Sequence, residues 1–119
     1  MTGTSPRKAV VETYIEGFRR SDHAMILSCL AEDVVWEMHG RTTLRGKEAF
    51  DAEIGNDAFE GGPELWLDRL VEEGDTVVAT GGGRTRRKDG EVLGFLFSDV
   101  FTFTGDAISR LETYQVNLV

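Results

Sequence analysis

A single carboxylate interrupts a run of aromatic residues in the segment FLFSDVFTF. If this segment is a strand, Phe95, Phe97, Asp99 and Phe101 share one face, because side chains alternate between the two faces of a strand. Burial among phenylalanines disfavours the charged form of a carboxyl group, so we expect a raised pKa for Asp99. Asp99 would then be a neutral hydrogen-bond donor near pH 7. The plainer alternative is a partly solvated face, or an Asp99 that only satisfies a backbone group.

A phenol on the first expected helix is the second candidate for chemistry. Tyr14 lies on an apolar stripe with Val11, Ile15 and Phe18 at helical spacing. A buried phenol must find a hydrogen-bond partner, and such a residue is more often a core tyrosine than a catalytic one. Two neutral donors that converge in an apolar site form an oxyanion hole, which stabilises negative charge developing on a substrate oxygen. Tyr14 and Asp99 are the candidate pair.

The segment VVWEMHG ends an apolar strand with a histidine. Alternation places Trp36 and Met38 on one face and Glu37 and His39 on the other. His39 has the intrinsic pKa suited to acid–base work, but it points away from Met38 unless Gly40 marks a bulge. The alternative for His39 is a solvated residue at the end of a strand.

Composition limits the possible partners. The 119 residues form one domain, residues 1–119, and the net charge of −8 argues against nucleic acid and anionic membrane as partners. Cys29 is the only cysteine and there are two histidines, so the sequence offers no disulfide and no metal-ligand spacing. We expect no metal and no cofactor. With no apolar run of signal-peptide or membrane-span length, we expect a cytoplasmic protein.

The candidate residues must be positioned by helices that precede a sheet. Helices first and strands afterwards predict an α+β fold, with the helices packed on one face of a curved antiparallel sheet. The first expected helix runs from Ser5-Pro6, as N-cap and first helical residue, to about Ser21. Ser21 or Asp22 can cap a short second helix that carries Met25, Ile26, Cys29 and Leu30, and a third runs over Lys47–Glu53. NDAFEGGP is expected to be a loop. The expected strands are EDVVWEMHG, ELWLDRLVEE, DTVVATGGG, a hairpin from Arg84 to Asp106 with a Lys-Asp-Gly turn, and AISRLETYQVNLV.

Three segments carry a resemblance to a known family. AVVETYIEGF, LAEDVVWE and DVFTFTGDAI resemble the first helix, the first strand and the final strand pair of SnoaL-like polyketide cyclases and ketosteroid isomerases, in the nuclear transport factor 2-like superfamily. The resemblance covers nearly the whole chain. It implies a cone-like barrel, in which three N-terminal helices close a strongly curved antiparallel sheet around one pocket. It also implies a homodimer formed through the open face of the sheet.

The resemblance further implies roles for individual residues. In the isomerases, a tyrosine and an aspartic acid at the places of Tyr14 and Asp99 hold the substrate oxyanion, and the raised pKa of the aspartic acid is a known case. The aspartate base of those enzymes falls on Met38, whose thioether cannot accept a proton. Glu112, on a face corresponding to the family's cavity side, is one replacement, and His39 is another. The alternative for Glu112 is an ion pair with Arg110 or a surface charge.

The leading functional expectation is an isomerase or cyclase that stabilises the enol or enolate of a small, apolar carbonyl compound. A non-catalytic ligand-binding module of the same fold is the alternative, with Met38 as its evidence. An epoxide-opening hydrolase would need an aspartate–arginine–aspartate set around a water, which the sequence does not provide clearly. Seven side chains are expected to form the ligand pocket: Phe18, Trp36, Met38, Phe95, Phe97, Phe101 and Tyr114.

Overall fold

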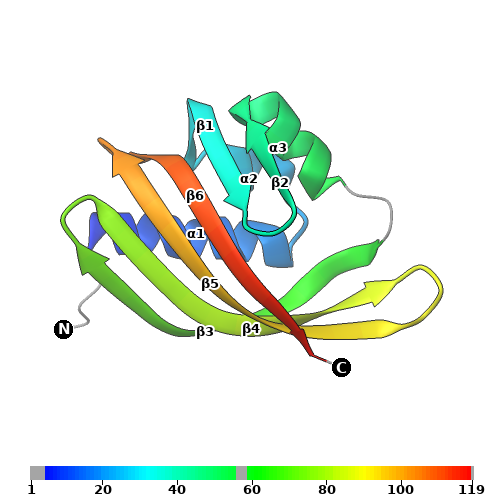
Figure 1. The fold of residues 1–119 in the computed structure, drawn as a ribbon. Helices are drawn as coiled ribbons and strands as arrows, with labels where there is room; N and C mark the ends of the chain where they lie inside the picture. Colours follow the sequence, from blue (N-terminus) through cyan, green and yellow to red (C-terminus); the bar gives the residue numbers. More distant parts are fainter. Residues whose placement is uncertain (1–4, 56–58, 119) are drawn as a thin grey trace.

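A computed structural model describes residues 5–55 and 59–118. It contains three helices and a six-stranded sheet that wraps around the first helix (Figure 1). The helices are α1 (Pro6–Arg19), α2 (His23–Leu27) and α3 (Gly46–Ile54). The strands are β1 (Leu30–Met38), β2 (Thr42–Arg45), β3 (Phe59–Glu73), β4 (Thr76–Arg87), β5 (Val92–Thr104) and β6 (Ala107–Leu118). In this part of the chain no helix is long and apolar enough to cross a membrane.

The helices begin where the sequence predicts. Ser5 caps α1 by accepting a hydrogen bond of 3.1 Å from the Lys8 backbone N–H, and proline fills the first helical position. Asp22 caps α2 in the same way through the N–H of Met25. The second helix is shorter than expected, because the chain enters β1 at Leu30 instead of continuing the helix. Its single buried residue, Ile26, packs into the core.

The sheet differs from the expected closed antiparallel barrel in two ways. Its strand order is β2-β1-β6-β5-β4-β3, so the two outermost strands are not paired and the sheet is open. Strand β1 runs parallel to β6, while the other neighbours are antiparallel. The parallel pair arises from the path of the chain, which leaves β1, passes through β2, α3 and the next three strands, and pairs its last strand, β6, with β1. The sheet is therefore mixed and strongly curved but not closed.

Two local expectations also need correction. The segment Thr42–Arg45 forms β2, an edge strand antiparallel to β1, which the sequence pattern did not indicate. Part of the expected loop NDAFEGGP is strand, since β3 begins at Phe59, and residues 56–58 lie outside the described residues.

The helices lie on the concave side of the sheet (Figure 1), and buried residues of both helices and strands form one hydrophobic core. Phe50 of α3 is fully buried, and its ring stacks on Trp36 of β1 with 4.4 Å between ring centroids. Tyr14 of α1 meets the Phe101 ring edge-on at 5.3 Å. These aromatic contacts tie both helices to the sheet, and they fix the side chains that border the pocket described below.

A run of three glycines in β4 allows the strands to approach closely. A Cβ atom at Gly81 would lie 2.0 Å from the backbone oxygen of Trp66, and one at Gly83 would lie 2.7 Å from the ring of Phe95. The pairing of β3 with β4 also changes register between Leu67 and Arg69. The glycines therefore leave room for phenylalanine rings inside the bend of the sheet.

Candidate active site

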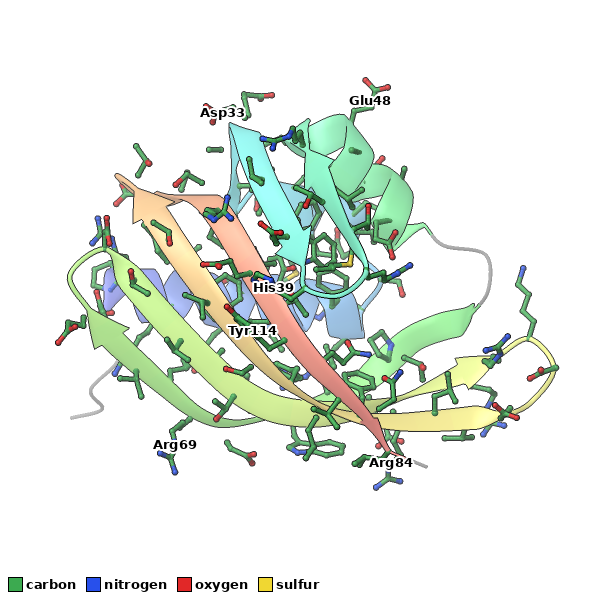
Figure 2. All side chains as sticks on the ribbon, in the orientation of Figure 1. Asp33, His39, Glu48, Arg69, Arg84 and Tyr114 are labelled. Atoms are coloured by element: carbon green, nitrogen blue, oxygen red, sulfur yellow. The ribbon has the colours of Figure 1, made fainter. Side chains whose placement is uncertain are left out.

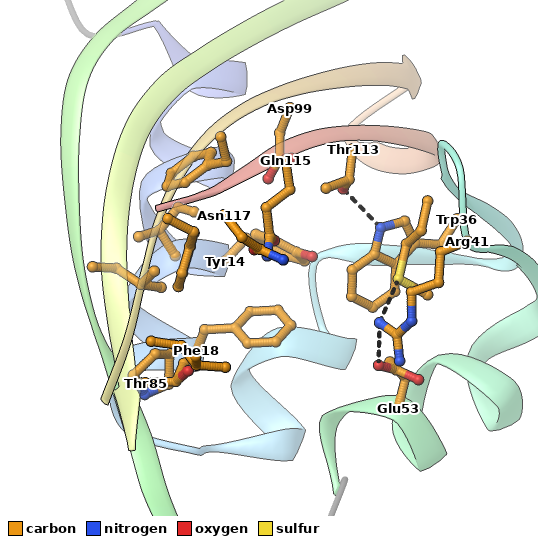
Figure 3. A pocket seen from close by; sticks show the side chains of 17 residues that line it. Tyr14, Phe18, Trp36, Arg41, Glu53, Thr85, Asp99, Thr113, Gln115 and Asn117 are labelled. Carbon is orange, nitrogen blue, oxygen red and sulfur yellow. Dashed lines mark hydrogen bonds and ion pairs between the residues drawn. The ribbon is translucent and has the colours of Figure 1, made fainter. Parts of the chain in front are cut away.

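One pocket of about 410 Å³ lies between α1, β1, α3 and the concave face of the sheet (Figure 3). This volume falls within the range of small-molecule sites. Most of its lining side chains are apolar or aromatic, and a smaller set is polar. The polar and charged lining residues are Tyr14, Arg41, Glu53, Thr85, Asp99, Thr113, Gln115 and Asn117.

Asp99 lies on β5, lines the pocket and is 8% exposed. Burial raises the pKa of its carboxyl group from 3.8 to about 7, although the neighbouring Thr113 hydroxyl acts in the opposite direction. Its Oδ1 atom is buried and has no hydrogen-bond partner among the described residues. A buried polar atom without a partner carries a desolvation penalty, which a ligand that bonds to it removes. The sequence-based expectation of a raised pKa for Asp99 is confirmed.

Tyr14 lines the same pocket from α1 and is 2% exposed. Burial raises the pKa of its phenol well above 10, and the nearby Asp99 carboxyl group adds to that rise. Its ring is held by Phe18, at 5.1 Å between centroids, and by Phe101. Tyr14 therefore keeps its proton at all physiological pH values and presents a fixed hydroxyl donor. The structure brings Tyr14 and Asp99 to one pocket.

Trp36 and Met38 face the pocket as alternation on β1 predicts. The indole N–H of Trp36 donates a hydrogen bond of 2.9 Å to Oγ1 of Thr113. Thr113 is in turn the cross-strand neighbour of Asp99. Trp36 of β1, Thr113 of β6 and Asp99 of β5 are therefore successive polar neighbours along the pocket.

The expected phenylalanine wall is present with one difference. Phe18, Phe95 and Phe97 line the pocket. Phe101 is fully buried and lies behind Tyr14, so it supports the tyrosine ring and does not border the pocket. An apolar wall of this kind excludes water and strengthens hydrogen bonds made inside it.

The last strand presents to the pocket a different face from the one expected. Phe103 pairs with Ile108 while Thr102 pairs with Arg110, so Ser109 is an extra residue in β6. One extra residue turns every following side chain to the opposite face. Beyond this bulge the pocket is lined by Thr113, Gln115 and Asn117. The expectation that Glu112 and Tyr114 face the cavity is wrong.

His39 and Tyr114 lie on the outer face of the sheet, turned away from α1 (Figure 2), and Glu112 contacts His39 there. The His39 ring stacks on Tyr114 at 4.4 Å, and its Nε2 lies 3.3 Å from Oε1 of Glu112. Arg110 contacts Glu112 at 3.9 Å and binds Glu37 at 2.8 Å. This is the ion-pair alternative considered for Glu112. The structure does not bring either expected proton carrier to the pocket.

The pocket also contains an ion pair that the sequence pattern did not indicate. Arg41 Nη1 lies 3.1 Å from Oε2 of Glu53, and the same nitrogen donates to the sulfur of Met38 at 3.4 Å (Figure 3). The Gln115 amide donates to Asn117 at 3.0 Å along the same wall. Glu53 lies on a correctly predicted helix, but only the path of the chain through β2 brings Arg41 to it. The bulge that turns Gln115 inward likewise has no clear sequence signal.

Two further kinds of site can be compared with the described residues, a metal site and the water-holding site of an epoxide hydrolase. Among residues 5–55 and 59–118, no cluster of three or more His, Cys, Asp or Glu side chains is arranged to hold a metal ion. The pocket holds two carboxyl groups and one arginine, but Arg41 pairs with Glu53 and the Oδ1 atom of Asp99 has no partner among the described residues. These contacts do not form the aspartate–arginine–aspartate set that epoxide opening was expected to require.

A comparison with models of known protein families identifies the family of this chain. The family model described as a SnoaL-like domain matches residues 11–111. The chain belongs to the SnoaL-like domain family. A comparison with curated proteins gives no match. The resemblance found in the sequence is thereby confirmed at the level of the family, whereas a particular reaction is not.

Solved structures share the fold of this SnoaL-like domain at low sequence identity. A nuclear transport factor 2-like protein of unknown function from Burkholderia pseudomallei is 24% identical, with a TM-score of 0.86 over 93% of this chain and 91% of that chain. A protein from Catenulispora acidiphila with a ketosteroid isomerase-like fold, in complex with trimethylamine, is 16% identical, with a TM-score of 0.81 over 93% and 86% of the two chains. An LEH-like epoxide hydrolase of M. tuberculosis is 18% identical, with a TM-score of 0.84 over 97% and 86%. The scaffold thus occurs in enzymes and in proteins of unknown function.

Proposed function

We propose that this SnoaL-like domain binds a small, largely apolar carbonyl compound and stabilises its enol or enolate oxygen with Tyr14 and Asp99. The observation that carries the proposal is the buried Oδ1 atom of Asp99, which has no partner among the described residues and borders the same pocket as the Tyr14 phenol. A ligand oxygen between the two groups would receive a hydrogen bond from each. The reaction class is an isomerisation or cyclisation through an enolate.

The chemistry follows from the protonation states of the two donors. Tyr14 is neutral because burial raises its pKa well above 10, and Asp99 is neutral up to about pH 7. When a proton leaves the carbon beside a carbonyl group, negative charge develops on the oxygen. Donors already in place stabilise that charge, and each contributes about 3 kcal/mol in known oxyanion holes. The apolar walls keep water from competing for the same donors.

Phenols test this proposal, because a phenolate resembles an enolate oxygen attached to an apolar ring. Affinities of a series of phenols of graded acidity should be measured by calorimetry for wild type, Tyr14→Phe and Asp99→Asn. The proposal expects micromolar binding that weakens at least tenfold in Tyr14→Phe. Affinity that is equal in all three proteins would overturn it. Thr43→Val, an exposed change outside the pocket, is the matched control.

A non-catalytic ligand-binding module is the second candidate, and Met38 favours it. Met38 borders the pocket at the position where the resembling isomerases carry their base, and a thioether accepts no proton. Met38→Asp separates the two candidates. A large gain in enolisation rate would mean that an intact oxyanion site had lacked only a base. No enolisation by wild type or by a folded Met38→Asp variant would favour the binding module.

We also propose a homodimer formed through the outer face of the sheet. Trp66, Leu96 and Val116 form one row across the strands, since Gly82 pairs with both Trp66 and Leu96, and Leu96 pairs with Val116. Val116 is 63% exposed, and Tyr114 and Leu118 extend the same apolar patch on β6. An apolar patch of this kind on the open face of a sheet suits a second copy of the chain.

A further inference from the structure

Glu53 is the pocket carboxyl group that pairs with a cationic side chain. Glu53 projects from α3, its side chain is 22% exposed, and its Oε2 lies 3.1 Å from Nη1 of Arg41. Arg41 follows the end of β1, and its guanidinium also donates to the sulfur of Met38. These two contacts hold the Glu53 carboxylate at the pocket wall (Figure 3).

The two pocket carboxyl groups have different surroundings. Asp99 is buried, with a pKa of about 7 and an Oδ1 atom that no described residue contacts. Glu53 forms an ion pair with a guanidinium. Two carboxyl groups in one site whose environments differ in this way suit opposite roles, one as a hydrogen-bond donor and one as a proton acceptor.

We infer that Glu53 is the proton acceptor of this pocket and that Arg41 is its positioning residue. The inference rests on the proposed function, which supplies the donors but no base. In the proposed step, Oε1 of Glu53 takes a proton from the carbon next to the ligand carbonyl. The C–H electron pair becomes the new C=C bond, and the C=O π pair moves to the oxygen held by Tyr14 and Asp99. Glu53 then returns the proton to a different carbon, so that atoms and charge balance.

This assignment also accounts for the methionine on β1. A carboxylate at residue 38 would compete with Glu53 for the same Arg41 nitrogen, whereas the Met38 sulfur accepts a weak hydrogen bond from it and leaves the Glu53 ion pair intact. The base is therefore carried by α3 instead of β1, and the substrate class is an apolar ketone or aldehyde with an acidic C–H near Glu53.

The experiment uses 5-nitrobenzisoxazole, whose ring opens when a base removes its C–H proton. The C–H pair forms the nitrile, the N–O bond breaks, and the electron pair goes to a phenolate oxygen, which absorbs visible light. We expect wild type to accelerate this reaction and Glu53→Gln to lower kcat/KM at least a hundredfold, the usual contribution of a general base. Glu48→Gln, on the same helix but exposed, is the matched control and should keep the wild-type rate.

Chemical rescue distinguishes a base from a residue needed only for structure. Added acetate should restore the rate of Glu53→Ala in proportion to its concentration, and it should not affect wild type. A Glu53→Gln rate equal to wild type, a lack of rescue, or no acceleration by wild type would overturn the inference. Phenol binding reports separately on the proposed function, because the affinity of Glu53→Gln for phenols depends on Tyr14 and Asp99. Tight phenol binding without proton transfer would therefore reject Glu53 as the base and leave the oxyanion site of Tyr14 and Asp99 in place.

Discussion

Asp99 and Thr113 are direct cross-strand neighbours on β5 and β6, and both side chains face the pocket. The Thr113 hydroxyl lowers the pKa of Asp99, while burial raises it by more. Thr113 also accepts the indole N–H of Trp36. Thr113 therefore affects both the pKa of Asp99 and the position of the Trp36 side chain, which borders the pocket.

The stability of the fold should depend on pH through Asp99. The pKa of Asp99 is raised in the folded state, so between about pH 4 and pH 7 the folded protein holds a proton that the unfolded chain has lost. The contribution of Asp99 is therefore most favourable below pH 4 and is lost as pH rises to 7. A change in pKa from 3.8 to about 7 corresponds to roughly 4 kcal/mol.

Urea denaturation of wild type and Asp99→Asn at several pH values measures this effect. The free energy of unfolding of wild type, relative to that of the variant, should fall by up to roughly 4 kcal/mol from pH 4 to pH 7. Asparagine does not titrate, so subtracting the free energy of unfolding of the variant removes the pH dependence due to the other carboxylates. A difference that is independent of pH would contradict a raised pKa for Asp99.

Thr113→Val should raise the pKa of Asp99 above 7 and destabilise the fold. Valine removes the hydroxyl that lowers this pKa, and it leaves the buried indole N–H of Trp36 without its acceptor. An unsatisfied buried donor costs about 1–3 kcal/mol. NMR titration of the Asp99 carboxyl carbon gives its pKa, and urea denaturation gives the free energy of unfolding. A pKa that stays the same or falls would show that the hydroxyl does not stabilise the carboxylate.

Gly81→Ala should destabilise the sheet strongly, whereas Gly94→Ala should not. A Cβ at Gly81 would lie 2.0 Å from a backbone oxygen, which cannot move aside as a side chain can. At Gly94 the nearest atom would be 3.8 Å away, an ordinary contact. We expect a loss of at least ~2 kcal/mol for Gly81→Ala by thermal denaturation. Equal stability of the two variants would mean that the close approach of β3 and β4 is absent in solution.

Val116→Lys should convert the proposed homodimer to a monomer. Val116 is 63% exposed, so a lysine there is tolerated in a free monomer but would be desolvated against the apolar patch of a second copy. Sedimentation equilibrium gives the mass of each protein. Thr104→Lys, at an exposed site near the end of β5, is the control. A wild-type protein that is monomeric at all concentrations would reject the dimer.

Local patterns predicted much of the fold. Strict alternation on β5 correctly placed Phe97, Asp99 and Phe101 on one buried face, because the period of a strand depends only on the strand itself. Capping residues likewise located the starts of α1 and α2. The buried Asp99 was predictable for the same reason, since its apolar neighbours on the strand are visible in the sequence.

Longer-range features could not be predicted in this way. The parallel pairing of β1 with β6 depends on the route of the whole chain. The extra residue Ser109 leaves no composition signal, yet it decided which face of β6 meets the pocket and so removed Glu112 from it. The Arg41–Glu53 pair joins residues from a turn and a helix that only the tertiary fold brings together.

A crystal structure of the protein with bound 4-nitrophenol, grown below pH 7 so that Asp99 keeps its proton, tests the central claim most directly. We predict that the phenol oxygen lies within hydrogen-bond distance of both the Tyr14 hydroxyl and the Asp99 carboxyl group, with the ring against Phe18 and Trp36. A phenol bound with its oxygen at the Arg41 side of the pocket, or a pocket filled by its own side chains, would contradict an oxyanion site formed by Tyr14 and Asp99.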